Sequence, residues 1–148
     1  MDKNAYMLFL AKFTHELQQL RRLAKFEYEP IFMHDDYELH EYAKNFLDLK
    51  FPFQWIGPGS DYAIWPRLSP DLHPLCFFLW GFIKSKVYAK PLDATDVKEL
   101  ENRIHRAFME ILPEMLAAAV KAYKERLKLV VENEGNLVDV HDENEHLQ

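Results

Sequence analysis

The chain has 148 residues, of which 49% are hydrophobic and 14% aromatic, and its formal net charge is −6. This length suffices for one domain with a single core, and the apolar content excludes a wholly disordered protein. The negative net charge argues against a domain that binds DNA through electrostatic attraction alone, because such domains are usually basic. A single cysteine excludes an internal disulfide and gives no sign of an oxidising compartment.

The first fifty residues predict two helices around a short strand. Apolar spacings of three and four predict an amphipathic helix over residues 4–25. Its expected inner stripe is Phe9, Phe13, Leu17, Leu20 and Ala24. The aromatic run over residues 26–34 favours a buried strand, whose regular part follows Pro30. A second helix is expected over residues 38–49, with one face formed by Leu39, Ala43, Phe46 and Leu47.

The middle of the chain predicts a long loop followed by a helix. Residues 51–70 hold four of the eight prolines and two of the four glycines, which is typical of loops. Inside this stretch, residues 62–65 predict a short strand that Pro66 ends. A third helix is expected over residues 74–88, because Pro74 suits a first turn. Its expected inner stripe is Leu75, Phe78, Leu79, Phe82 and Ile83.

The last part of the chain predicts two more helices and an acidic tail. Thr95 or Asp93 is expected to cap the fourth helix. Its inward residues are predicted to be Val97, Leu100, Ile104, Phe108 and Ile111. Pro113 is expected to begin the fifth, with Leu116, Val120, Tyr123, Leu127 and Val130 inward. We expect a single domain over residues 1–135, and a disordered acidic tail over residues 136–148.

The N-terminal residues give no membrane or signal segment. The apolar run over residues 7–11 is broken by Lys12 and is too short for either. We therefore expect a soluble, intracellular protein.

The most informative segment runs from Ser69 to Gly81 and reads Ser-Pro-Asp-Leu-His-Pro-Leu-Cys-Phe-Phe-Leu-Trp-Gly. It resembles the signature Ser-Pro-Asp-Leu-x-Pro-Leu-Asp-Phe-Phe-Leu-Trp-Gly of mariner-like transposases, enzymes that cut and rejoin DNA with three metal-binding carboxylates. The run from Phe32 to Asp35 is similar to the family's strand that ends in its second catalytic Asp. His40 lies where the histidine of that second motif falls, and further matches extend to Leu116.

The resemblance implies an α/β protein with a partial RNase H-like fold. Few short strands are expected to pack with about five helices, and the early antiparallel strands are expected to be missing. The ancestral family uses Mg²⁺ or Mn²⁺, but its third carboxylate falls on Cys76, whose sulfur binds such hard ions poorly. Nothing in residues 1–30 resembles the first carboxylate. Asp35 is then the residual metal position, and we expect no bound cofactor and no functional catalytic residue.

These departures predict a transposable-element-derived protein that is catalytically inactive and retains nucleic-acid or protein binding. Expected partners are weakly bound DNA, a related transposase chain or a second copy, since missing strands leave an open sheet edge. The resemblance implies a nuclear location, and neither a membrane nor a small-molecule substrate is expected. The alternative is a DDE-type endonuclease subunit, active only with a missing N-terminal part or a partner.

Two further interpretations of the acidic and histidine residues stay open. Asp35 can bind one weak divalent ion together with Asp36 or Glu38, or the three can form an acidic turn that caps the next helix. Separately, His34, His40 and Cys76 can converge on zinc, because the ancestral fold brings the second and third carboxylate positions together.

Cys76 also allows two interpretations. It can act as a nucleophile activated by His73, three residues earlier. It can equally be a neutral replacement on a helix, since no motif supplies an oxyanion hole.

A basic group and three tryptophans complete the candidate residues. Lys121, Lys124 and Lys128, with Arg126 among them, are candidates for phosphate contacts, or else ordinary solvated charge. The tryptophans at 55, 65 and 80 are most simply packing residues, although an exposed one can stack on a base or mark a partner surface.

Overall fold

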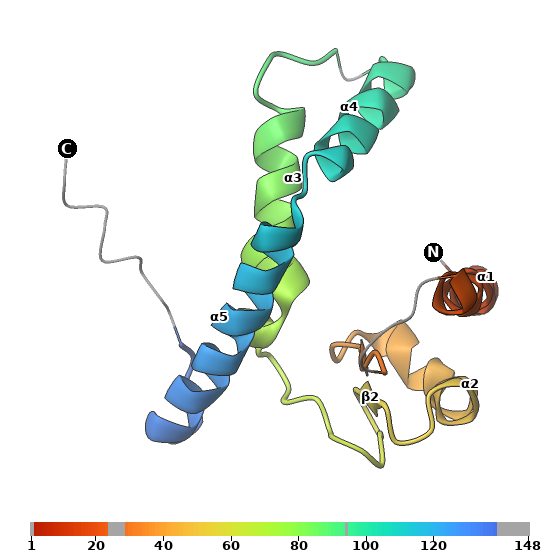
Figure 1. Cartoon of the computed structure of the whole chain (residues 1–148), viewed down its shortest axis with the longest axis vertical. Helices are drawn as coiled ribbons and strands as arrows, with labels where there is room; N and C mark the ends of the chain where they lie inside the picture. Colours follow the sequence, from red (N-terminus) through yellow and green to blue (C-terminus); the bar gives the residue numbers. More distant parts are fainter. Residues whose placement is uncertain (1, 24–28, 94, 139–148) are drawn as a thin grey trace. The chain divides into compact units, whose positions relative to one another are not determined.

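The computed structural model describes residues 2–23, 29–93 and 95–138. The chain divides between Leu68 and Ser69 into two compact units, here termed the N-terminal unit and the C-terminal unit. Both are drawn in Figure 1, and each is described by itself. The sequence predicted a single domain over residues 1–135.

The N-terminal unit consists of helices around a minimal parallel sheet. Helix α1 spans Lys3–Leu23, the 3-10 helix η1 spans Glu38–Ala43, and α2 follows over Lys44–Lys50. Strand β1 (Phe32–Met33) pairs in parallel with β2 (Trp55–Ile56), in the register Phe32↔Trp55 and Met33↔Ile56. The helical segment between them is the crossover that a parallel pair requires.

The buried face of α1 differs from the predicted stripe. Its buried side chains are Tyr6, Leu10 and Thr14, whereas Phe9 and Leu20 are exposed. The cluster around them consists of Tyr6, Leu10, Ala43, Leu47, Phe51 and Trp55, with Leu17 and Phe46 packed against it. The helix has more apolar residues than the small core covers, so packing against η1 and the rest of this cluster selects the face.

The predicted strand over residues 62–65 is wrong. The Ser60 hydroxyl accepts the backbone N–H groups of Tyr62 and Ala63 at 3.1 and 3.3 Å, and it donates to the carbonyl of Trp55 at 2.5 Å. Those amides are therefore satisfied by a side chain instead of a strand ladder. A single bridge from Ala63 to Ile56 is formed, and the regular strand is β2, inside the predicted loop.

The described residues of the C-terminal unit form helices joined by loops, and none lies in a strand. A 3-10 turn, η2 (Pro70–Leu72), leads into a π-helical turn, η3 (Leu75–Leu79), and then α3 (Trp80–Val87). Helix α4 (Val97–Met109) returns beside α3, and α5 (Pro113–Glu132) follows (Figure 1). The helix predicted over residues 74–88 thus begins with wider, i→i+5 turns.

Packing in the C-terminal unit is sparse. Its buried cluster is Ile83, Val87 and Ala107, with Leu79, Phe82, Leu100 and Ile111 against it. Most inward positions predicted for α4 and α5 are instead exposed, namely Val97, Ile104, Phe108, Leu116, Val120 and Leu127. The α4 cap is Asp96, which accepts the N–H of Glu99 at 2.9 Å, and neither Thr95 nor Asp93 takes this role.

The described chain is therefore mostly helical, with five α-helices and one pair of short parallel strands. This agrees with the predicted α/β class of few strands and about five helices. Of the predicted tail, only Asn136–Val138 fall within the description, and Val138 is buried. Residues 139–148 lie outside it. No described helix combines the length and the apolar character needed to cross a membrane.

Candidate functional site

Asp35 lies in the turn between β1 and η1, where its carboxylate already has partners. Its Oδ1 lies 2.7 Å from Nδ1 of His40 and accepts the N–H of Tyr37 at 3.2 Å. Tyr37 is the residue that precedes η1, and it makes no side-chain cap itself. Asp35 thus braces the turn instead of capping the helix as one interpretation predicted.

The neighbouring acidic residues do not join Asp35 in a cluster. Asp36 points its Oδ2 to the end of the loop, 3.3 Å from the N–H of Leu68 and 3.7 Å from Nε of Arg67. Glu38 is exposed at the start of η1. Within residues 2–23, 29–93 and 95–138, no group of three His, Cys, Asp or Glu side chains has a geometry that could hold a metal ion.

Behind Asp35, two imidazole rings stack in the core of the N-terminal unit. The rings of His34 and His40 are 4.1 Å apart and nearly parallel, with an angle of 16° between them. The hydroxyl of Tyr6, from α1, forms a short hydrogen bond with Nε2 of His34. Burial raises the pKa of Tyr6, and the negative charge of Asp35 raises that pKa further. These contacts join Tyr6, His34, His40 and Asp35 in one row of polar side chains.

Cys76 lies in the other unit, at the start of the π-helical turn, and it is exposed. Its N–H donates to the carbonyl of His73 at 2.8 Å. The Nδ1 of His73 accepts the N–H of Leu75 at 3.2 Å, so this ring nitrogen braces the turn. A nucleophile needs a base within reach of its thiol. The Nδ1 of His73 has a backbone partner, and both interpretations of Cys76 stay predictions.

The Ser69–Gly81 segment has a clear packing role in the C-terminal unit. The guanidinium of Arg126 lies 4.4 Å from the ring centroid of Phe77 and donates to the carbonyl of Asp71 at 3.1 Å. Arg126 also donates to the carbonyl of Val138 at 3.3 Å, while Oδ2 of Asp71 accepts the N–H of Val138 at 3.0 Å. Arg126 therefore ties α5 to the motif and is not part of an outward basic face.

The three lysines of α5 keep the exposure that binding requires. Lys121, Lys124 and Lys128 are all exposed, and their spacing of three and four places them on one side of the helix. Lys121 forms a 3.8 Å ion pair with Glu125, four residues later, with 79% of its side chain exposed. Such exposed pairs are weak, so they compete little with a phosphate.

The tryptophans divide between packing and exposure. Trp55 and Trp65 are buried, as the simpler interpretation predicted, whereas Trp80 is 45% exposed. Sequence reasoning missed the Tyr6–His34 pair and the inward Arg126, because both join residues far apart in the chain. No family model matches this sequence, and no curated protein or solved structure shows detectable similarity to it.

Proposed function

We propose that this chain is a transposable-element-derived binding protein that lacks catalysis, built on a reduced form of the mariner-like, RNase H-like scaffold. Nucleic acid is its proposed ligand, held through the lysines of α5. A related transposase chain or a second copy is the proposed protein partner, and the nucleus the proposed location. The observation that carries the proposal is the combination of the Ser69–Gly81 motif with a cysteine at position 76.

The chemistry at the two surviving positions supports the absence of catalysis. Two-metal phosphoryl transfer needs several hard oxygen ligands around each ion. Cys76 offers a soft, mostly protonated sulfur instead. One carboxylate oxygen of Asp35, Oδ1, already contacts His40 and the backbone N–H of Tyr37. A divalent ion at Oδ1 of Asp35 has to compete with both contacts.

The arrangement of α5 supports nucleic-acid binding without base recognition. Exposed lysines on one helix face can neutralise successive phosphates, which positions a duplex and carries no sequence information. The binding is expected to be weak, because the whole chain is acidic and three phosphate contacts are few.

Purified protein is expected to leave supercoiled plasmid DNA intact in Mg²⁺ or Mn²⁺. Asp35→Asn is expected to behave identically, because no metal-dependent step passes through this carboxylate. Agarose-gel analysis of the plasmid measures nicking and linearisation directly. If the wild-type protein nicks DNA in a metal-dependent way and Asp35→Asn abolishes this nicking, the proposal is wrong. That result favours the alternative of a DDE-type endonuclease subunit.

Replacing Lys121, Lys124 and Lys128 together by glutamine is expected to weaken binding to duplex DNA. Three lost phosphate contacts flatten the slope of log K against log salt by up to about 2.7. Gel-shift titrations at several salt concentrations give this slope. The matched control replaces Lys12, Lys50 and Lys98, three exposed lysines of other helices, by glutamine. An equal loss in the control, or no shift of wild type at low salt, contradicts the assignment.

A further inference from the structure

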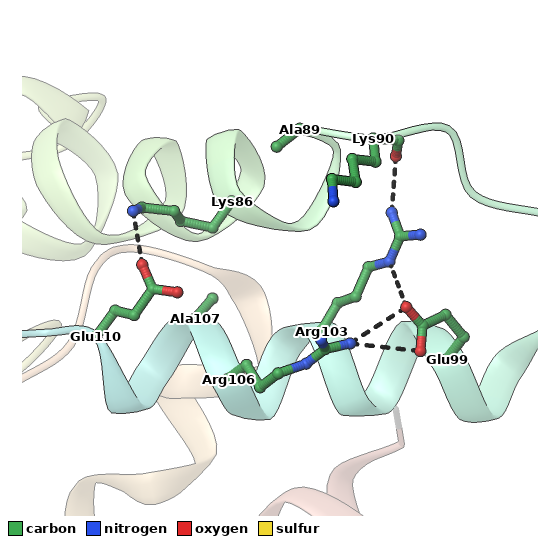
Figure 2. A pocket seen from close by; sticks show the side chains of 8 residues that line it. All are labelled: Lys86, Ala89, Lys90, Glu99, Arg103, Arg106, Ala107 and Glu110. Atoms are coloured by element: carbon green, nitrogen blue, oxygen red, sulfur yellow. Dashed lines mark hydrogen bonds and ion pairs between the residues drawn. The ribbon is translucent and has the colours of Figure 1, made fainter.

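A cleft lined mostly by charged side chains lies between α3 and α4 in the C-terminal unit. It has a volume of about 350 Å³ and opens between the end of α3, the loop after it and one face of α4 (Figure 2). Two small side chains, Ala89 and Ala107, leave its centre open. The polar groups on its walls are Lys86, Lys90, Glu99, Arg103, Arg106 and Glu110.

Arg103 holds the walls of the cleft in place. Its Nη1 donates to the carbonyls of Val87 and Lys90 at 3.0 and 2.7 Å, and its Nη2 donates to that of Pro91 at 3.0 Å. Its Nε donates to Oε1 of Glu99 at 2.8 Å. Only 17% of this side chain is exposed. The loop that carries Lys90 is therefore fixed before any ligand arrives, which lowers the entropic cost of binding.

The charges around the cleft do not balance. Four cations face two carboxylates, which leaves an excess of two positive charges. Glu110 pairs with Lys86 at 2.6 Å, and Glu99 is shared between Arg103 and Arg106. Lys90 has no ion pair among the described residues. Figure 2 shows that its side chain points into the cleft beside Arg103. Such an excess attracts an anion into the cleft.

We propose that this cleft binds a phosphate group, with Lys90 and Arg106 as its principal donors and Lys86 at its edge. A dianionic phosphate matches the excess of two charges on the cleft walls, and its oxygens can accept charge-assisted hydrogen bonds from Lys90 and Arg106. The site is separate from the lysines of α5 and does not depend on the proposed function. The phosphate can belong to a free phosphorylated small molecule, as a dianionic monoester, or to a nucleic-acid backbone, whose diesters each carry one negative charge.

To test this proposal, the ¹⁵N-labelled full chain is titrated with inorganic phosphate. The phosphate replaces chloride, so that the ionic strength stays constant. Amide resonances of the α3–α4 loop are expected to shift in a saturable manner, with a Kd on the order of 1 mM. Lys90→Ala/Arg106→Ala is expected to weaken this Kd at least about tenfold, because charge-assisted hydrogen bonds are lost. Lys90→Gln alone, which leaves the Arg106–Glu99 pair intact, is expected to give a smaller loss.

The matched control is Lys84→Ala/Lys98→Ala, which removes two exposed cations from the same helices outside the cleft. It is expected to retain wild-type phosphate binding. An equal loss in this control, or the absence of saturable shifts in wild type, overturns the proposal. A nucleoside monophosphate and a duplex DNA serve as further probes. Weaker binding of both by Lys90→Ala/Arg106→Ala indicates a backbone phosphate, and weaker binding of the monophosphate alone indicates a small molecule.

Discussion

Replacing Trp55 by alanine is expected to lower the free energy of unfolding of the N-terminal unit by about 3–5 kcal/mol. The indole is 1% exposed, and its Nε1 donates to Oδ1 of Asp48 at 3.0 Å. Its ring also fills the space beside Gly57, where an added Cβ comes within 2.7 Å of Cζ3. Removing it leaves a cavity in a small core and deprives the carboxylate of Asp48 of a donor. Urea unfolding followed by far-UV circular dichroism measures the loss.

Trp80→Ala is the matched control for this experiment, because Trp80 is 45% exposed and lies in the other unit. Its effect on stability is expected to stay below about 1 kcal/mol. Because the chain has two compact units, the unfolding curve is fitted with a separate transition for each. Equal losses from the two substitutions contradict the placement of Trp55 at the centre of the core.

Raising the pH above 10 is expected to destabilise the N-terminal unit through Tyr6. The folded-state pKa of Tyr6 is raised above its ordinary value of 10.0, chiefly by burial and also by Asp35. Below pH 10 both states carry the proton, so the stability is fully present. As the pH rises from there towards the folded-state pKa, the unfolded state releases the proton first. Stability then falls by about 1.4 kcal/mol per pH unit for this group.

Tyr6→Phe isolates this contribution. The variant loses the hydrogen bond to His34, which is expected to cost about 1 kcal/mol at neutral pH. Above pH 10 its stability is expected to fall less steeply than that of wild type. Tyr62→Phe, at a 50% exposed tyrosine of the same unit, is the control and should keep the wild-type slope. Unchanged alkaline slopes in Tyr6→Phe count against a buried, neutral hydroxyl at position 6.

Helices were well predicted because their signals are local. The apolar period of α1, the proline that opens α5 and the acidic N-cap region of α4 all lie within a few residues of the bonds they influence. The buried faces were predicted poorly. Phe9 is exposed and Tyr6 buried, because a hydroxyl can enter the core once His34, 28 residues away, supplies its partner.

In the candidate site, too, the local contacts could be predicted from the sequence and the long-range contacts could not. Position 35 was identified from the resemblance, and its contact with His40 spans only five residues, which a sequence pattern can suggest. The stacking of His40 on His34 and the link to α1 depend on which elements pack together. Arg103 is an ordinary surface arginine in the sequence, and the carbonyls that it holds lie 12 to 16 residues away.

The sequence by itself determined the five helices, the position of the Ser69–Gly81 motif and the chemistry of a thiol at residue 76. Tertiary structure decided the rest. It let the Ser60 hydroxyl take the amides of the predicted 62–65 strand, and it turned Arg126 inward against Phe77. Backbone propensity acts over a few residues, whereas burial and side-chain hydrogen bonds depend on surfaces that only folding brings together.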